Sequence, residues 1–142
     1  MSQQNNETKC VLLIDSELPL GLLANTAAVL ALTIGKRVEG IIGSDVVDGS
    51  GQIHTGITTI PLPILKSTQE GLQVLKQKVS TEAFQDLLVV DFTNAAQTTK
   101  TYEAYTQKIA TFTSGDLYYL GIALYGDRKK INKLTGNLSL LR

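Results

Sequence analysis

The stretch that decides the fold is Lys9-Cys-Val-Leu-Leu-Ile14, near the start of the chain. Its continuous apolar run is typical of a strand that is covered on both faces. The same pattern returns in Asp86-Leu-Leu-Val-Val-Asp91 and in Leu117-Tyr-Tyr-Leu-Gly-Ile-Ala-Leu124. Because helical stretches separate these strands, the sequence predicts an α/β fold.

The helices are predicted from apolar spacing and from their end signals. Leu22 to Ile34 is apolar nearly all round, and Ser67-Thr-Gln-Glu70 forms a capping box at the start of a second helix. Tyr102, Tyr105, Ile109 and Phe112 form a further helical stripe. We predict one α/β domain over residues 9–142, after a disordered tail of residues 1–8. Its sheet should be mixed and mainly parallel, with helices on both faces.

The middle of the chain predicts a hairpin and a sheet edge. Val38 to Val47 and Gln52 to Ile57 are β-rich and flank the turn sequence Asp48-Gly-Ser-Gly51. Thr58 to Leu65 contains two prolines, which favour an extended backbone and confine it to the edge of a sheet.

Composition excludes several functional classes. Lys plus Arg equals Asp plus Glu, 13 each, so no global field attracts nucleic acid. Cys10 is the only cysteine and His54 the only histidine, so we expect no disulfide, metal or cofactor. The polar start carries no secretion signal, and Leu18 to Ile34 is shorter than the ~20 residues of a membrane span. We therefore expect a cytoplasmic protein that does not enter a membrane.

Polar residues follow each buried strand and predict a ligand site. If the strands are parallel, Asp15, Asp91 and Asp127 share the rim where open α/β sheets bind ligands. The residues that we expect to bind a small molecule there are Asp15, Gly21, Asn25, Thr93, Asn94 and Gln97. Two carboxylates held close together would need a ligand donor between them, or one would show a raised pKa. The alternative is structural, with Asp15, Asp127 and Thr93 or Asn94 as helix caps and Asn25 tied to a loop.

The two ends of the chain resemble the type-2 peptidyl-tRNA hydrolases. Lys133-Leu-Thr-Gly-Asn-Leu138 matches the last motif of that family, and Leu88-Val-Val-Asp91 lies where it places a catalytic aspartate. The resemblance implies the hydrolase fold, with Asp91 and Lys9 as the catalytic residues. Leu22 and Val29 stand where the family has a lysine and a histidine.

The whole chain resembles more closely an uncharacterised bacterial family, known only as domain of unknown function two thousand. The residues that carry this resemblance include Leu18-Pro-Leu-Gly-Leu-Leu-Ala-Asn25 and Gly56-Ile-Thr-Thr-Ile-Pro61. That family is thought to share the hydrolase fold, so the two resemblances predict the same architecture.

Three functions remain open from the sequence. The first is small-molecule binding, or a diverged enzyme, at the rim of the sheet. The second is hydrolysis of peptidyl-tRNA or a related ester by Asp91 and Lys9. The third is a structural homo-oligomer, because an all-round apolar first helix suits a homodimer contact. Arg128 to Leu134 is basic enough to meet tRNA, although a solvated helix face is the favoured interpretation.

Overall fold

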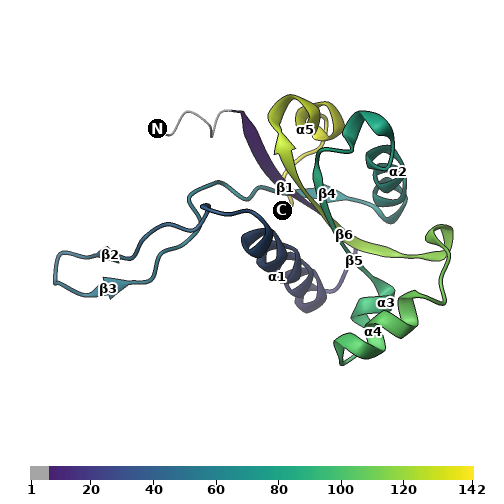
Figure 1. Cartoon of the computed structure of the whole chain (residues 1–142), viewed down its shortest axis with the longest axis horizontal. Coiled ribbons are helices and arrows are strands. Elements are labelled where there is room, and N and C mark those ends of the chain that lie inside the picture. The colour runs from purple at the N-terminus through teal and green to yellow at the C-terminus, as the bar shows by residue number, and fades with distance from the viewer. Residues whose placement is uncertain (1–6) are drawn as a thin grey trace.

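The computed structural model describes residues 7–142 and shows one mixed α/β domain built on a four-stranded sheet (Figure 1). The strand order is β4-β1-β6-β5. The strands are β1 (Thr8–Asp15), β4 (Ile64–Ser67), β5 (Leu88–Thr93) and β6 (Tyr119–Asp127). Most of the tail expected at residues 1–8 lies outside the described residues, but β1 already begins at Thr8. The N–H of Arg128 also donates to the carbonyl of Glu7 at 2.8 Å, so the ordered domain starts before Lys9.

The direction of β6 corrects the predicted sheet. β1 pairs parallel with β4, whereas β6 pairs antiparallel with both β1 and β5. Three strands therefore point the same way, but only one of the three pairings is parallel. The mixed sheet is confirmed, and its pairing is mainly antiparallel rather than mainly parallel. Asp127, at the end of β6, consequently lies opposite Thr8 at the other end of the sheet from Asp15.

Helices cover both faces of the sheet, as the sequence predicts (Figure 1). α1 (Leu20–Arg37) packs on one face, where Leu30 and Ile34 join Leu12 in one core cluster. α2 (Gln69–Val79) and α5 (Arg128–Thr135) pack on the other face, around Leu13 and Ile122. Alternate residues of β1 therefore feed two separate cores, which explains its unbroken apolar run.

The start of α2 is shifted from the prediction by one residue. Thr68 is the N-cap, and its hydroxyl accepts a hydrogen bond from the N–H of Gly71 at 2.9 Å. Ser67 instead ends β4, so the capping box predicted from Ser67 to Glu70 is not formed. The buried face of α2 is the predicted one, with Leu72, Leu75 and Val79 in the core.

The segments after β5 are short and peripheral. α3 (Asn94–Gln97) and α4 (Tyr102–Ile109) follow the end of β5, and α4 contains no buried residue. The predicted aromatic stripe thus falls on a helix as far as Ile109, and none of its four residues is fully buried. Tyr102 is 80% exposed, and its ring meets that of Tyr105 edge-on at 5.4 Å. Two short 3-10 helices, Glu82–Phe84 and Ser114–Asp116, complete the helical elements.

The predicted hairpin is confirmed and projects from the body of the molecule (Figure 1). It consists of β2 (Val46–Val47) and β3 (Ile53–His54), which pair antiparallel. The chain returns from the hairpin into β4, an edge strand, as the prolines predict. Within residues 7–142, no helix combines the length and the apolar character needed to cross a membrane.

Candidate functional site

The two acidic residues of the predicted rim lie in the same half of the sheet. Asp15 ends β1, and Asp91 lies opposite Ile122 of β6, which in turn lies opposite Leu13 of β1. Because β6 runs between β1 and β5, these two strands are two strand spacings, about 10 Å, apart, and Asp15 lies two residues further along β1 than Leu13. The shared rim therefore consists of β1, β4 and β5 alone, without the end of β6.

Each of these carboxylates has its own partner. Asp15 is only 6% exposed and accepts a hydrogen bond from the N–H of Glu17 at 3.0 Å. This bond closes the turn before α1 but does not cap the helix, whose N-cap is Pro19. Asp91 forms an ion pair with Lys76 of α2, with Nζ and Oδ2 3.1 Å apart. The lysine supplies the positive charge that the sequence analysis expected from a ligand.

The other residues expected to bind a ligand point to different places. Gly21, Asn25 and Gln97 are exposed. In α1 the buried polar residue is Thr26, one position further along the helix than Asn25. Asn94 is half-buried and accepts a hydrogen bond from the N–H of Tyr118 at 3.1 Å.

Thr93 is fully buried at the N-cap position of α3, but its hydroxyl caps nothing. Within residues 7–142, the Thr93 hydroxyl meets no hydrogen-bond partner. Of the alternative capping roles, Asp127 fulfils its own: the carboxylate accepts a hydrogen bond from the N–H of Lys130 at 3.0 Å.

Asp91 borders a hollow of about 370 Å³ between α1, β5 and α4. Its polar lining includes Thr33, Thr99 and Tyr105. Burial and the nearby charge of Asp91 raise the pKa of the Tyr105 phenol above its ordinary value. None of the six predicted ligand-binding residues lines this hollow.

The second predicted catalytic residue, Lys9, lies at the other end of the sheet. Lys9 is opposite Gly126 of β6, four residues along that strand from Ile122, the partner of Asp91. Four residues of strand span about 13 Å, in addition to the two strand spacings between β1 and β5. The Lys9 ammonium instead donates to the side-chain carbonyl of Asn132 in α5 at 2.7 Å. Lys9 and Asp91 therefore cannot act on one bond in this arrangement.

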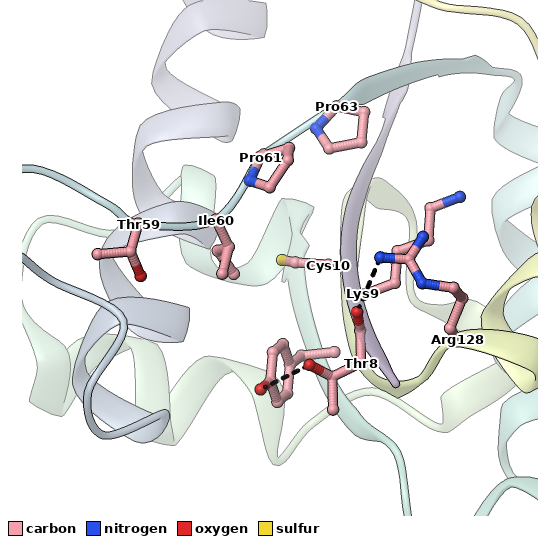
Figure 2. A pocket seen from close by; sticks show the side chains of 9 residues that line it. Thr8, Lys9, Cys10, Thr59, Ile60, Pro61, Pro63 and Arg128 are labelled. Atoms are coloured by element: carbon pink, nitrogen blue, oxygen red, sulfur yellow. Dashed lines mark hydrogen bonds between the residues drawn. The ribbon is translucent and has the colours of Figure 1, made fainter. Parts of the chain in front are cut away.

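Lys9 borders a small pocket at the start of β1 (Figure 2). We call it the β1-edge pocket. Its volume is about 120 Å³, and its apolar lining is supplied by the chain that leads into β4 and by the Tyr125 ring. The lining residues are Thr8, Lys9, Cys10, Thr59, Ile60, Pro61, Pro63, Tyr125 and Arg128.

The pocket exists because β4 begins too late to cover all of β1. The parallel register starts at Leu12, whose N–H donates to the carbonyl of Pro63 at 3.0 Å. Backbone groups alternate along a strand, so those of Cys10 point toward the same side as those of Leu12. Pro63 stands where the next ladder donor would be, and proline has no N–H to give to the Cys10 carbonyl. The prolines thus leave a short piece of strand edge facing the pocket.

Among residues 7–142, two cationic side chains and no acidic one line the β1-edge pocket. The Arg128 guanidinium donates to the Thr8 carbonyl at 3.2 Å, and the Tyr125 hydroxyl donates to the Thr8 hydroxyl at 3.4 Å. Figure 2 shows Lys9 and Arg128 on one side of β1, with the Cys10 sulfur on the side of Ile60. The pocket therefore has an apolar wall and a positively charged rim.

Cys10 contributes a neutral wall to the pocket rather than a nucleophile. Its side chain is 2% exposed, and burial raises the pKa of the thiol to about 11. The reactive form of cysteine is the thiolate, which is scarce at neutral pH when the pKa is that high. Within residues 7–142, no group of three or more His, Cys, Asp or Glu side chains is placed to hold a metal ion.

One comparison with known proteins shows the family of the chain, and another shows a structure with the same fold. The sequence family described as "Protein of unknown function (DUF2000)" matches residues 8–142. The chain belongs to this family. Among solved structures, a protein of unknown function from Agrobacterium tumefaciens is 24% identical and superposes on the DUF2000 chain with a TM-score of 0.84. The match covers 94% of this chain and 97% of the other, and at that identity it shows the fold alone. No curated protein sequence matches the chain.

Among the residues around the β1-edge pocket, only Lys9 was predicted from the sequence to be a catalytic or ligand-binding residue. Arg128 was interpreted as part of a solvated helix face, and Cys10 as an inert core residue. The sequence feature of this DUF2000 protein that could have predicted the pocket is Pro61-Leu-Pro63, next to a predicted strand. Prolines at a sheet edge leave ladder positions unfilled, and an unfilled position next to a buried strand is a place where a ligand can pair.

Proposed function

We propose that this DUF2000 protein binds a small molecule that carries an anionic group next to a compact apolar group. The apolar group occupies the β1-edge pocket, against Ile60, Pro61 and the Tyr125 ring. The anion faces Lys9 and Arg128. The observation that carries the proposal is the combination of two cations, no acidic side chain and an uncovered strand edge around one apolar cavity.

The size of the pocket limits the ligand. A typical drug-sized ligand needs a pocket of roughly 300–1,000 Å³. The β1-edge pocket has about 120 Å³, which is slightly less than an engineered cavity of about 150 Å³ that accepts benzene. It therefore holds one branched aliphatic group or a small ring, while the rest of the ligand lies over the charged rim. The backbone N–H and C=O of Cys10 give such a ligand a hydrogen-bonding partner inside.

Ligand binding is favoured over hydrolysis of peptidyl-tRNA. Ester hydrolysis needs an acid–base group and a stabiliser of the oxyanion around the same bond. Lys9 and Asp91 lie at opposite ends of the sheet, and Leu22 supplies neither function. We propose that the resemblance to type-2 peptidyl-tRNA hydrolases reflects a common architecture rather than a common reaction.

Binding can be tested with simple anions and matched neutral and cationic analogues. Titrate ¹⁵N-labelled protein with benzoate and with 3-methylbutanoate, and use benzyl alcohol and benzylamine as controls. The anions should shift the amide signals of Thr8, Cys10 and Thr59 at millimolar concentration, whereas benzylamine should not. If neither anion perturbs these amides, or if benzylamine perturbs them equally, the proposed chemistry of the pocket is wrong.

Substitutions at the rim test the role of charge. A hydrogen bond to a charged group contributes about 1.5–3 kcal/mol, so Arg128→Gln should weaken benzoate binding at least about tenfold. Lys129→Gln is the matched control, because Lys129 is the next residue of the same helix, is exposed and does not line the pocket. Equal effects of the two substitutions would indicate a general electrostatic attraction instead of a site.

We also propose that the protein forms a homodimer, as the apolar first helix predicts. Leu20 and Leu32 of α1 are 81% and 78% exposed, which is unusual for large aliphatic side chains on one surface helix. Dimer formation does not depend on the β1-edge pocket.

A further inference from the structure

The projecting hairpin exposes several large apolar side chains. We call residues 39–59 the arm. It leaves the body directly after α1, turns through β2 and β3, and returns toward β4 (Figure 1). Five large aliphatic side chains of the arm lie between 55% and 77% exposed. They are Ile42, Val46, Val47, Ile53 and Ile57. A hydrophobic patch of this kind marks an interaction surface.

Hydrogen bonds along the arm fix its conformation although it has no core. At the tip, Asp48 accepts hydrogen bonds from the N–H groups of Ser50 at 2.8 Å and Gln52 at 3.0 Å, and its other oxygen lies 2.8 Å from His54 Nε2. Nearer the body, the Asp45 carboxylate accepts from the N–H of Gly56 at 2.9 Å. A two-stranded hairpin is marginally stable on its own. The hydrogen bonds therefore hold the arm in a defined conformation, while its apolar side chains are not covered by the rest of its own chain. We expect a partner molecule to cover them.

Glycine allows the two sides of the arm to cross closely. A Cβ atom at Gly56 would overlap the carbonyl oxygen of Gly43 on the opposite side. Beside this crossing, both sides of the arm line a hollow of about 880 Å³ that includes Val46, Ile53 and Ile57. The hollow gives the arm a concave apolar surface.

The charges of the arm and of the helix that precedes it are complementary. The arm contains Glu39, Asp45 and Asp48 but no Lys or Arg. α1 has no charged residue from Leu20 to Gly35, and its only charges are Lys36 and Arg37 in the last turn. The apolar arm thus ends in carboxylates, and the apolar helix ends in cations.

We propose that the partner of the arm is a second copy of this chain, bound about a two-fold axis. The two arms lie antiparallel, so the tip of each arm reaches the end of α1 in the other copy. Asp45 and Asp48 then face the partner's Lys36 and the partner's Arg37. The exposed aliphatic side chains of both arms are covered by one another and by Leu32. A two-fold contact of this kind is closed, so it produces a dimer and not a filament.

The length of the arm sets the area of such a contact. About nine residues of extended chain separate the root of the arm from its tip, which gives a length of about 30 Å. With a two-stranded width of about 10 Å, each arm presents a face of about 300 Å², so the contact between the two arms buries on the order of 600 Å². The contacts of each arm tip with the partner's Leu32 and with the end of α1 in the partner add to this area, toward the ~1,000 Å² that a biological interface needs. A second copy covers the exposed apolar side chains of the arm and of α1. It also places the carboxylates of each arm next to the cations at the end of α1 in the other copy.

The mass of the full chain in solution tests the proposal first. Light scattering should give twice the chain mass of 15.3 kDa for the unchanged protein. Val47→Asp combined with Ile53→Asp should give the monomer mass with an unchanged circular dichroism spectrum, because neither residue contacts the core. Val74→Asp is the control, since Val74 is 50% exposed on α2, and it should remain dimeric. A monomeric unchanged protein, or a dimer that survives the arm substitutions, would overturn the proposal.

The charged contact can be tested by reversal and rescue. Arg37→Glu should raise the dimer dissociation constant at least tenfold. Ser44→Lys, placed next to Asp45 on the exposed arm, should recover most of that loss when combined with Arg37→Glu. An Arg37→Glu protein that dimerises as tightly as the unchanged chain would contradict the contact between arm tip and helix end.

Cross-linking tests the antiparallel arrangement directly. The variant Lys36→Cys with Ser50→Cys carries one thiol at the root and one at the tip, about 30 Å apart within one chain. A short bismaleimide should therefore join two chains and give a covalent dimer, since Cys10 is buried. Chains that stay uncoupled while both thiols are modified would show that the tip of one arm does not reach the root of the other.

Discussion

The arm and the central sheet are built from the same aliphatic residues but place them in opposite environments. Val11, Leu13 and Ile14 of β1 are at most 1% exposed, whereas Val46, Val47 and Ile53 of the arm are 60–72% exposed. β-Branched residues favour an extended backbone in both regions. What differs is the layer that covers them. A strand pattern in the sequence therefore predicts an extended backbone. Whether its side chains are buried depends on other elements, which lie far away in the chain or in another molecule.

The contrast is sharpest within α1, where Leu30 is fully buried and Leu32 is 78% exposed. Leu30→Ala should lower the free energy of unfolding by about 2–5 kcal/mol, because it leaves a cavity in the core. Leu32→Ala should change it by less than about 0.5 kcal/mol. Both are measured by urea unfolding in the Val47→Asp, Ile53→Asp background, which removes the contribution of dimerisation. Equal losses would show that α1 is buried on all sides within one chain.

Thiol reactivity compares the two regions by a kinetic measurement. A pKa of about 11 instead of 9.0 leaves Cys10 with about one-hundredth of the usual thiolate at pH 8. In the Ser50→Cys variant, a disulfide reagent should modify the arm thiol at least about a hundredfold faster than Cys10. The reaction should show two phases of equal amplitude. A single fast phase would mean that the β1-edge pocket opens Cys10 to solvent.

Gly121 and Gly35 lie in opposite surroundings, because Gly121 is closely packed and Gly35 faces open space. A Cβ atom at Gly121 of β6 would lie 2.7 Å from Thr26 Cγ2 and 3.0 Å from Leu30 Cδ1, both in α1. Gly121→Ala should therefore destabilise the protein by about 1–3 kcal/mol. Gly35, in α1, has nothing within 4 Å of such a Cβ, and Gly35→Ala should stabilise by about 0.5–1 kcal/mol. Thermal unfolding measures both, and a neutral Gly121→Ala would mean that α1 can move away from the sheet.

The smallest expected effect is a pH dependence confined to the arm. A hydrogen bond from His54, and then those from the backbone N–H groups of Gln52 and Ser50, lower the pKa of Asp48 below 3.8. A lowered carboxyl pKa means that these bonds persist above the ordinary pKa and are lost as the pH falls through the lower value. The amide signals of Ser50 and Gln52 should thus titrate with a midpoint below 3.8, while those of β1 stay unchanged. A midpoint at or above 3.8 would show that the turn is not formed in solution.

The parts of the fold that the sequence predicts are those set by local patterns. The strands around Val11, Val90 and Ile122 were predicted from apolar runs, and the hairpin from Asp48-Gly-Ser-Gly51. The strand around Val90 was expected to be fully buried, but residues 88–91 of β5 are only half-buried, because β5 is an edge strand of the sheet. The start of α2 was missed by one residue, because Ser67 and Thr68 are both good caps and the strand register decides between them. The helical stripe from Tyr102 was predicted from its spacing, and the structure leaves Tyr102 exposed and Tyr105, Ile109 and Phe112 half-buried.

The direction of β6 could not be predicted from its own residues. An apolar run reads the same whether the strand is parallel or antiparallel to its neighbours, and the pairing of β6 with β1 joins residues more than one hundred positions apart. Because β6 runs antiparallel to β1, Asp127 lies at the opposite end of the sheet from Asp15. For the site, the sequence offered Lys9 but not Arg128, because their proximity depends on the same pairing. Pro63 in the sequence already indicated a missing backbone donor at the edge of the sheet. Only the register of β1 with β4 shows that the Cys10 carbonyl is the group left without that donor.

The central position of β6 has a consequence for how the chain acquires its structure. β6 lies between β1 and β5, although it is the last strand to be synthesised. Contacts of such large sequence separation slow folding, and exposed apolar strands invite aggregation until they are paired. During translation, almost the entire chain must therefore be synthesised before β4 and β6 can pair with both edges of β1. The final residues add to this delay, because Ser139 and Leu141 close the outer edge of β4 by hydrogen bonds to Lys66 and Ile64. A ribosome that stalls before the last strand would release a chain with its central strand unprotected.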